Sequence, residues 1–317
     1  MAVKKFDIFK HLFVIFIILS IIPVCRAEKN PQDDLPVRTP AVAGSFYPGD
    51  SVQLKNMILS FLKEAGKPTV QGKLIALIAP HAGYVYSGGV AAYSYKELIG
   101  RDYDTVIILG PSHFAPINGA AVFTNGYYET PLGKIPVNSD MAKKICSSDP
   151  PVLDLAKPHF SREHSIEVQL PFLQVTLKKF LIVPILIGQT DENFCKELAK
   201  QIFKAAEGTK TLIVASSDMS HYPPYDIANE TDKNTLKLIQ NFDAHSIHAA
   251  SQQMMQKYAA MELRTCLCGE QGVITTIYAA KQLGANHADI LKYANSGDSS
   301  AGDKKTVVGY GAVAFYE

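Results

Sequence analysis

The sequence predicts an α/β protein with a mostly parallel central sheet flanked by helices on both faces. Several short runs rich in Ile, Leu and Val are apolar at every position, which is typical of strands buried on both faces. Longer segments between them carry apolar residues at helical spacing. Because strands and helices alternate along the chain, the sheet is expected to be largely parallel.

Four continuous apolar runs and one mixed run are the predicted strands. The four continuous runs span residues 74–79, 105–109, 180–187 and 211–215. The fifth run, 306–315, contains glycines and fits either an edge or a central strand. No Pro/Gly/Ser-rich stretch and no repeat divides the chain after residue 37, so we expect a single domain over 38–317.

Three segments have the apolar stripe of an amphipathic helix. They span residues 51–65, 191–207 and 269–283. The stripe of the first contains Leu54, Ile58 and Leu62, and Asp50 or Ser51 is a suitable N-cap. These helices separate the predicted strands and are expected to cover the sheet.

The N-terminus predicts export. Three lysines precede an apolar run over residues 12–24, and this run of about 13 residues is too short to cross a bilayer, which needs roughly 20. A basic start, a short apolar run and a small residue at Ala27 are typical of a secretory signal peptide over residues 1–27. We expect a periplasmic or extracellular protein without a stable membrane span after cleavage. Lipoprotein anchoring at Cys25 is the alternative, although Val24 before it is larger than usual.

Residues 28–37 are polar and contain prolines, so they are expected to form a linker. Removal of residues 1–27 takes away four basic side chains and one acidic one. The formal balance then changes from 31 − 30 = +1 to 27 − 29 = −2. A chain this close to neutral has no electrostatic reason to bind nucleic acid.

Four cysteines remain after this cleavage, at positions 146, 195, 266 and 268. That number is too low for a disulfide scaffold in a domain of this size. An exported chain could still pair Cys146 with Cys195, because an oxidising compartment permits disulfides and the sequence does not set their connectivity.

Polar side chains follow three of the predicted strands at the point where each strand ends. His81 follows the first strand, His113 the second, and Asp218 and His221 the fourth. In open α/β sheets the carboxyl ends of the strands form the edge where ligands bind. Because neutral imidazole is a common metal ligand, this edge is a candidate metal site.

Two histidines need a further donor to make a usable site. The candidates are Asp218, His221, Glu163, His164 and Cys268. Cys268 lies just before Gly269, where a helix is predicted to begin, and a helix N-terminus favours the thiolate that ligates metals. Cys266 could be the ligand instead, or a disulfide partner, and Cys268 alone would more simply be a small buried residue.

Glu163 and His164 form another polar group. Ile166, Leu170 and Leu173 share a helical spacing, so both residues are expected at the start of a short helix, where an acid is favoured anyway. In a functional role either residue could orient a metal-bound histidine or transfer protons. The other histidines after the signal peptide are expected to be structural or exposed; they are His159, His245, His248 and His287.

Several motifs together resemble the Memo family. The stretch 39–48 (TPAVAGSFYP) is similar to the opening motif of that family. Further motifs follow in the family's order: 80–88 (PHAGYVYSG), 110–113 (GPSH), 130–133 (TPLG), 163–167 (EHSIE), 216–222 (SSDMSHY), 268–269 (CG) and 293–298 ending in SGD. The resemblance runs from about Arg38 to the C-terminus, and bacterial and archaeal members are often called AmmeMemoRadiSam system protein B.

The resemblance implies a fold similar to class III extradiol ring-cleaving dioxygenases of the LigB type. Those enzymes hold non-haem Fe(II) with two histidines and a carboxylate. In this chain the resemblance implies a cleft lined by His81, His113 and Cys268, with Asp218 and His221 beside it. A thiolate in place of the acid shifts the expected metal toward copper, or changes the redox behaviour of iron. Typical members look cytoplasmic, so the predicted signal peptide is a departure.

Three functions fit these expectations. The first is an iron- or copper-dependent oxidoreductase of a small molecule, with the metal on His81, His113 and Cys268. Its acid–base and orienting groups would be Asp218, His221, His164 and Glu163. The second is a non-catalytic protein that binds a metal, a small aromatic molecule or a peptide terminus in the same cleft. The third is a thiol enzyme built on Cys268 and a nearby histidine. The pattern assigns neither a substrate nor an oligomeric state.

Overall fold

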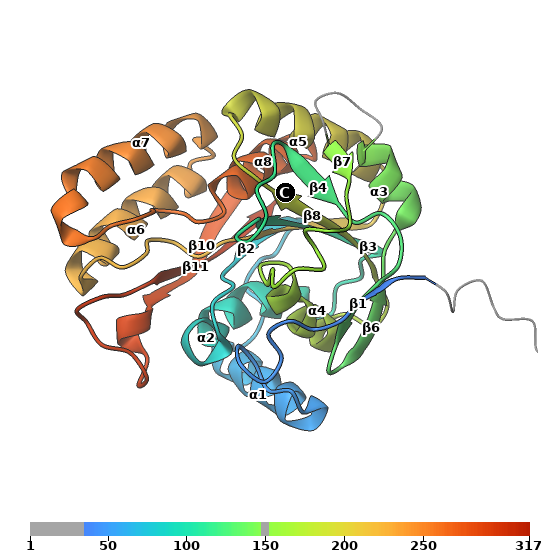
Figure 1. The fold of residues 1–317 in the computed structure, drawn as a ribbon, viewed down its shortest axis with the longest axis horizontal. Coiled ribbons are helices and arrows are strands. Elements are labelled where there is room, and N and C mark those ends of the chain that lie inside the picture. The colour runs from blue at the N-terminus through green and yellow to red at the C-terminus, as the bar shows by residue number, and fades with distance from the viewer. Residues whose placement is uncertain (1–34, 147–151) are drawn as a thin grey trace, which may run out of the picture. The chain divides into compact units, whose positions relative to one another are not determined.

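An eight-stranded mixed sheet forms the centre of the protein (Figure 1). The computed structural model describes residues 35–146 and 152–317, so the predicted signal peptide and residues 28–34 of the predicted linker lie outside the described residues. In spatial order the strands are β10 (His287–Asn295), β11 (Gly309–Tyr316), β2 (Leu74–Ala79), β9 (Thr211–Ser216), β3 (Thr105–Pro111), β8 (Leu181–Ile187), β4 (Ala120–Val122) and β7 (Val152–Asp154).

The middle of this sheet is parallel. Strands β2, β9, β3 and β8 are parallel neighbours, and β7 is parallel to β4. Strand β4 runs antiparallel to β8, and β11 runs antiparallel to both β2 and β10. The sheet predicted from the continuous apolar runs is confirmed, and the C-terminal run forms an internal strand, not an edge.

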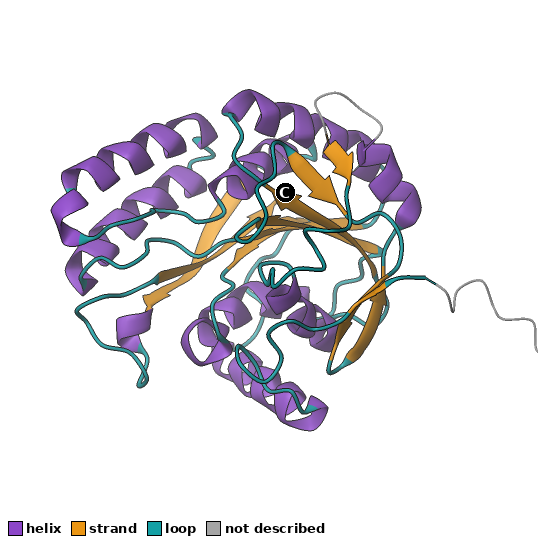
Figure 2. Cartoon of the chain, in the orientation of Figure 1, coloured by secondary structure: helices purple, strands orange, loops and turns teal. Residues whose placement is uncertain are grey.

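Helices cover both faces of the sheet (Figure 2). One face is covered by α1 (Ser51–Ala65), α2 (Tyr84–Tyr95) and α4 (Leu170–Thr176). The other carries α3 (Ser139–Cys146), α5 (Glu192–Ala206), α6 (Tyr225–Gln240), α7 (Ala244–Lys257) and α8 (Glu270–Gln282). This arrangement buries the central strands on both faces, which explains their lack of polar alternation.

The predicted helices form at the predicted places. Helix α1 has the expected bounds, and the Asp50 side chain accepts a hydrogen bond from the Gln53 backbone N–H, as an N-cap does. Its stripe residues Leu54, Ile58 and Leu62 are buried. Helices α5 and α8 each begin and end one residue inside their predicted ranges. Local sequence pattern therefore fixes these elements.

A second, three-stranded sheet contains the start of the described chain. It consists of β1 (Val37–Arg38), β5 (Tyr127–Thr130) and β6 (Gly133–Pro136). Val37 pairs with Tyr127, so the predicted linker ends one residue earlier than expected. The buried Arg38 guanidinium ion-pairs with Glu167 and donates to the His159 carbonyl at 3.0 Å. These interactions tie the first strand to the segment that precedes α4.

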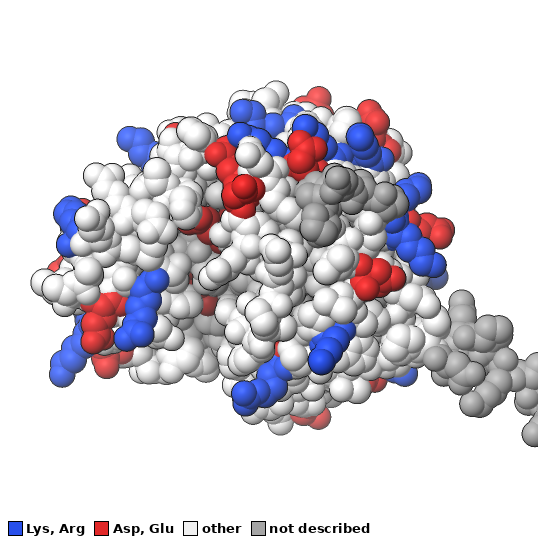
Figure 3. Space-filling model, turned by 45° about the horizontal axis from the view of Figure 1, so that its top comes forward, with Lys and Arg blue, Asp and Glu red and all other residues white. Residues whose placement is uncertain are grey.

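Acidic and basic side chains are interspersed over the face in Figure 3, which presents no extended surface of one sign. Among residues 35–146 and 152–317 there is no helix with the length and apolar character needed to span a membrane.

Cys146, Cys195, Cys266 and Cys268 are free thiols, so the Cys146–Cys195 disulfide considered above is not formed.

His159 is buried between two partners and acts structurally. Its Nδ1 lies 2.6 Å from the Tyr128 hydroxyl, and its Nε2 lies 3.0 Å from the carbonyl oxygen of Ala121. Because that carbonyl can only accept, the proton is on Nε2 and the Tyr128 hydroxyl donates to Nδ1. Burial lowers the pKa of His159 to about 4. The folded protein therefore holds this imidazole neutral.

This depressed pKa predicts acid-dependent destabilisation. As pH falls through about 6.5, the unfolded chain binds a proton that the folded chain refuses until about pH 4. The free energy of unfolding therefore falls by about 3 kcal/mol as the pH is lowered from about 6.5 to about 4. We expect the His159→Gln variant to show a shallower pH dependence of urea unfolding between pH 6.5 and 4. The exposed His287→Gln variant is the control, and equal slopes in all three proteins would contradict this account.

Candidate functional site

The carboxyl ends of three neighbouring parallel strands bring the predicted site residues together. His81 follows β2, His113 follows β3, and Asp218 follows β9, which lies between them. Cys268 reaches the same place from just before α8. The ligand-capable atoms of His81, His113 and Cys268 all lie within 4.8 Å of one another. These three side chains thus form a group that could hold a metal ion.

His81 presents one ring nitrogen to the thiol and the other to the protein interior. Its Nε2 lies 3.2 Å from Cys268 Sγ, and its Nδ1 lies 2.9 Å from Ser216 Oγ. Burial lowers the pKa of His81 well below its ordinary value, and the neighbouring His113 and His164 lower it further. The imidazole is therefore neutral, which is the form that binds metals.

His113 is held by the Glu163 carboxylate. Glu163 Oε1 lies 3.0 Å from His113 Nδ1 and also accepts hydrogen bonds from the backbone N–H groups of His164 and Ser165. Burial by itself raises the pKa of Glu163, but the hydrogen bonds from His113 and from backbone N–H groups hold it well below its usual range. Because an ionised carboxylate only accepts, Nδ1 of His113 carries a proton, and in the neutral ring Nε2 is free for a ligand.

The Cys268 thiol lies in the interior of the site. The backbone N–H of Asp218 donates to its Sγ at 3.2 Å. Burial raises the pKa of Cys268 well above its usual value, and the Asp218 carboxylate raises it further. Burial therefore favours the neutral thiol and opposes the preference for a thiolate that a helix N-terminus provides. A cation beside the sulfur, such as a metal ion, would favour the thiolate.

Gly269 explains why the cysteine at 268 reaches the site. A Cβ at this position would lie 2.6 Å from the Ser216 carbonyl oxygen and 2.9 Å from Ser217 Cβ. Only glycine allows this close approach of α8 to the end of β9. The alternative ligand Cys266 is buried elsewhere, where its Sγ donates to the Ser251 carbonyl oxygen at 3.5 Å, so that alternative is wrong.

Asp218 and His221 also lie beside Cys268. One oxygen of Asp218 accepts the His81 backbone N–H at 2.8 Å, and its other oxygen is 4.0 Å from His81 Nε2. Burial raises the pKa of Asp218 and lowers that of His221. Within the described part of the chain, the buried Nε2 of His221 has no hydrogen-bond partner. Together with Cys268, these two side chains form a second group whose ligand-capable atoms are within 4.8 Å.

His164 stacks on His113 at the open side of the site. The two ring centroids are 4.9 Å apart with an interplanar angle of 6°, and Phe46 contacts His164 edge-on at 4.7 Å. Burial lowers the pKa of His164. The predicted helix does not begin at Glu163: a 3-10 turn starts at Glu167, because the Glu163 carboxylate binds the next two backbone N–H groups instead.

Two buried polar residues of the site were not identified from the sequence. Gln169 and Ser216 are almost completely buried and hydrogen-bond each other at 2.7 Å behind His81. The only signal that could have found them is a polar residue inside an apolar stretch. That signal is weak, because a single polar residue in such a stretch more often caps or faces solvent.

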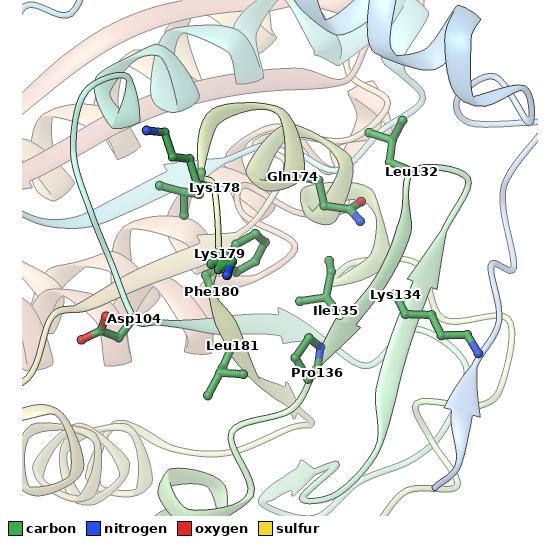
Figure 4. Close-up of a pocket in the computed structure, with 11 residues that line it drawn as sticks. Asp104, Leu132, Lys134, Ile135, Pro136, Gln174, Lys178, Lys179, Phe180 and Leu181 are labelled. Atoms are coloured by element: carbon green, nitrogen blue, oxygen red, sulfur yellow. The ribbon is translucent and has the colours of Figure 1, made fainter. Parts of the chain in front are cut away.

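A groove opens beside the candidate metal group. It has a volume of about 650 Å³ and is lined by residues 112–118 with Gly188 and Gln189. A groove of equal volume is lined by three lysines, Asp104 and apolar residues around the start of β8 (Figure 4). That second groove lies at the amino ends of β3 and β8 and includes no histidine or cysteine. The first groove therefore reaches the metal group at His113.

The Glu163–His113 contact predicts a loss of metal affinity in a Glu163→Gln variant. The amide keeps the size of the side chain but cannot supply the negative charge that holds the protonated Nδ1. We expect the affinity of the reduced protein for Co(II), measured by anaerobic titration, to fall about 10- to 100-fold. Glu207→Gln, at an exposed position, is the matched control. Equal affinity in both variants would mean that Glu163 does not orient His113.

The chain is similar in sequence to a known protein family. Residues 38–314 match the family described as "Memo-like protein". The chain is 37% identical to a "MEMO1 family protein" of Nitrosopumilus maritimus, with 88% of this chain and 99% of the relative covered. It is 38% identical to the "MEMO1 family protein MK0963" of Methanopyrus kandleri, with 88% and 98% covered.

A solved structure is also similar. The crystal structure of "uncharacterized protein JW3007" from Escherichia coli K12 matches with a TM-score of 0.45 and 14% identity, over 76% of this chain and 99% of that one. This likeness is too distant to support an argument about function. The match over residues 38–314 and the identity of more than a third to full-length relatives establish that this chain belongs to the Memo family.

Proposed function

We propose that this protein is a metal-dependent oxidoreductase of a small molecule. Its iron or copper ion would be held by Nε2 of His81, Nε2 of His113 and Sγ of Cys268. The observation that carries this proposal is the state of the two imidazoles. Both rings have Nδ1 engaged by the protein, and the Nε2 of His81 lies 3.2 Å from the thiol.

The donor set fits a redox-active transition metal. Imidazole suits iron and copper alike, whereas a thiolate favours the softer ions. Three protein donors leave coordination positions open for a substrate, as in catalytic sites. The hard-oxygen ions Mg²⁺ and Ca²⁺ are disfavoured by this set. When bound, the ion would supply one-electron chemistry that no side chain of the protein can perform.

The surrounding residues are suited to proton transfer. His221 has a buried Nε2 without a partner in the described chain, so this atom is available to a substrate group. His164 stands at the open side on His113, and its lowered pKa keeps it neutral and able to accept a proton. Asp218, with its raised pKa, lies between His81 and His221. Glu163 would act only by orienting His113.

A protein that binds a ligand in the same cleft without turnover is the alternative. Phe114 beside His113 favours it, because this side chain is 48% exposed and lines the adjacent groove. Arg162 lies over the Phe114 ring, 5.4 Å from its centroid. Such a surface suits a flat ligand whether or not it is transformed.

A His81→Ala variant tests the metal assignment. It removes one donor and leaves Cys268 without the imidazole nitrogen that lies 3.2 Å from its sulfur, so we expect it to lose most of its bound iron or copper. The measurement is element analysis of anaerobically purified protein, with the exposed His287→Ala as the control. Unchanged metal content in His81→Ala would remove this residue from the site. Oxygen uptake with a panel of catechols separates turnover from binding alone.

We also propose that the chain is exported. The support is the basic start and short apolar run of residues 1–27. Expression of the full chain in a bacterium should yield periplasmic protein whose N-terminal residue, determined by mass spectrometry, is Glu28. Recovery of full-length protein starting at Met1 in the cytosol would contradict export, and lipid attached to Cys25 would indicate the lipoprotein alternative.

A further inference from the structure

Ser216 holds the ring nitrogen of His81 that faces away from the thiol. It is the last residue of β9 and is almost fully buried. Its hydroxyl oxygen has three close polar neighbours: the Ser165 carbonyl oxygen at 2.5 Å, Gln169 Nε2 at 2.7 Å and His81 Nδ1 at 2.9 Å. A hydroxyl has one proton and two lone pairs, so these contacts use its whole capacity.

The partners of Ser216 determine where each proton lies. The Ser165 carbonyl can only accept, so the Ser216 proton points to it. The Gln169 amide nitrogen can only donate, so it occupies one lone pair of the Ser216 oxygen. The remaining lone pair faces His81 Nδ1, which must therefore carry a hydrogen. The neutral ring then has an unprotonated Nε2, and this is the nitrogen that faces Cys268.

The orientation of the Gln169 amide is fixed independently. Its Nε2 lies 3.0 Å from the carbonyl oxygen of Pro80, which can only accept, so the amide oxygen cannot occupy that position. Its Oε1 accepts the Tyr95 hydroxyl at 2.7 Å. Burial raises the pKa of Tyr95 well above its usual value, which keeps that hydroxyl a donor.

The structure around this chain of hydrogen bonds is rigid. The Tyr95 ring stacks on Phe172, with centroids 5.0 Å apart and an interplanar angle of 13°. Tyr95 comes from α2, Gln169 from the turn before α4, and Ser216 from β9, so three separate elements meet behind His81. Because these buried polar groups hydrogen-bond one another, only one arrangement of their protons fits.

We propose that Ser216 is a positioning residue that sets the tautomer of His81, because the Ser165 carbonyl takes its proton and leaves its oxygen as an acceptor. It imposes the Nδ1–H form and so leaves Nε2 of His81 free to bind the metal of the proposed function, on which the metal part of this inference rests. Without the Ser216 hydroxyl, Nδ1 of His81 would have no acceptor for its hydrogen. The proton of His81 would then move to Nε2 and block metal binding.

The tautomer can be measured directly and without a metal. Long-range ¹H–¹⁵N correlation spectra of the full chain, labelled with ¹⁵N-histidine, distinguish protonated from unprotonated ring nitrogens. We expect His81 in the wild type to carry its hydrogen on Nδ1. In Ser216→Ala we expect the Nε2–H form to appear. Gln169→Met, which leaves the Ser216 proton on the Ser165 carbonyl, should keep the Nδ1–H form. His113, held by Glu163, is the internal control and should stay unchanged.

Metal affinity provides the second readout. Co(II) titration of reduced protein should show about a 10- to 100-fold weaker affinity in Ser216→Ala than in the wild type and in the exposed control Gln282→Met. Two results would overturn the proposal: a hydrogen on Nε2 of His81 in the wild type, or an unchanged tautomer in Ser216→Ala. A wild type that binds no Co(II) would refute the proposed function but leave the tautomer result valid.

Discussion

The hydrogen bonding of two imidazole Nδ1 atoms is the interaction on which the whole site depends. His81 and His113 come from different strands, and each has Nδ1 held by a polar partner of the protein interior. Both sets of partners involve the segment 163–169. Glu163 holds one ring directly, and Ser165 and Gln169 hold the other through Ser216. This segment therefore engages the Nδ1 atoms of both rings.

The fold makes this arrangement possible by bringing backbone segments unusually close. Parallel pairing of β2, β9 and β3 places three strand ends side by side. Gly269 lets α8 approach the end of β9, and this contact brings the Cys268 sulfur within 3.2 Å of His81. The burial that results keeps the His81 imidazole neutral but raises the pKa of the thiol. The site is therefore prepared for a cation, whose charge would stabilise the thiolate that burial disfavours.

Much of this could be predicted from the sequence, for physical reasons. Continuous apolar runs identify strands buried on both faces, and the polar residues after those strands must lie at one edge. The choice of Cys268 over Cys266 rested on the resemblance to the Memo family and on a following glycine, whose steric role the structure shows. The prediction that a helix begins at Glu163 was wrong. The spacing of apolar residues does not show that the Glu163 carboxylate accepts the backbone N–H groups that follow it. Gln169 and Ser216 could not be found, because their role depends on contacts between segments distant in the chain.

In the proposed site, the nitrogens of His81 and His113 and the sulfur of Cys268 bind one metal ion together. X-ray absorption spectroscopy at the metal edge of the loaded wild-type protein observes all three ligands at once. We expect one sulfur scatterer at about 2.3 Å and two imidazole nitrogens at about 2.0–2.1 Å, with the sulfur signal lost in Cys268→Ser. A spectrum of the loaded wild type with only oxygen and nitrogen scatterers would contradict it.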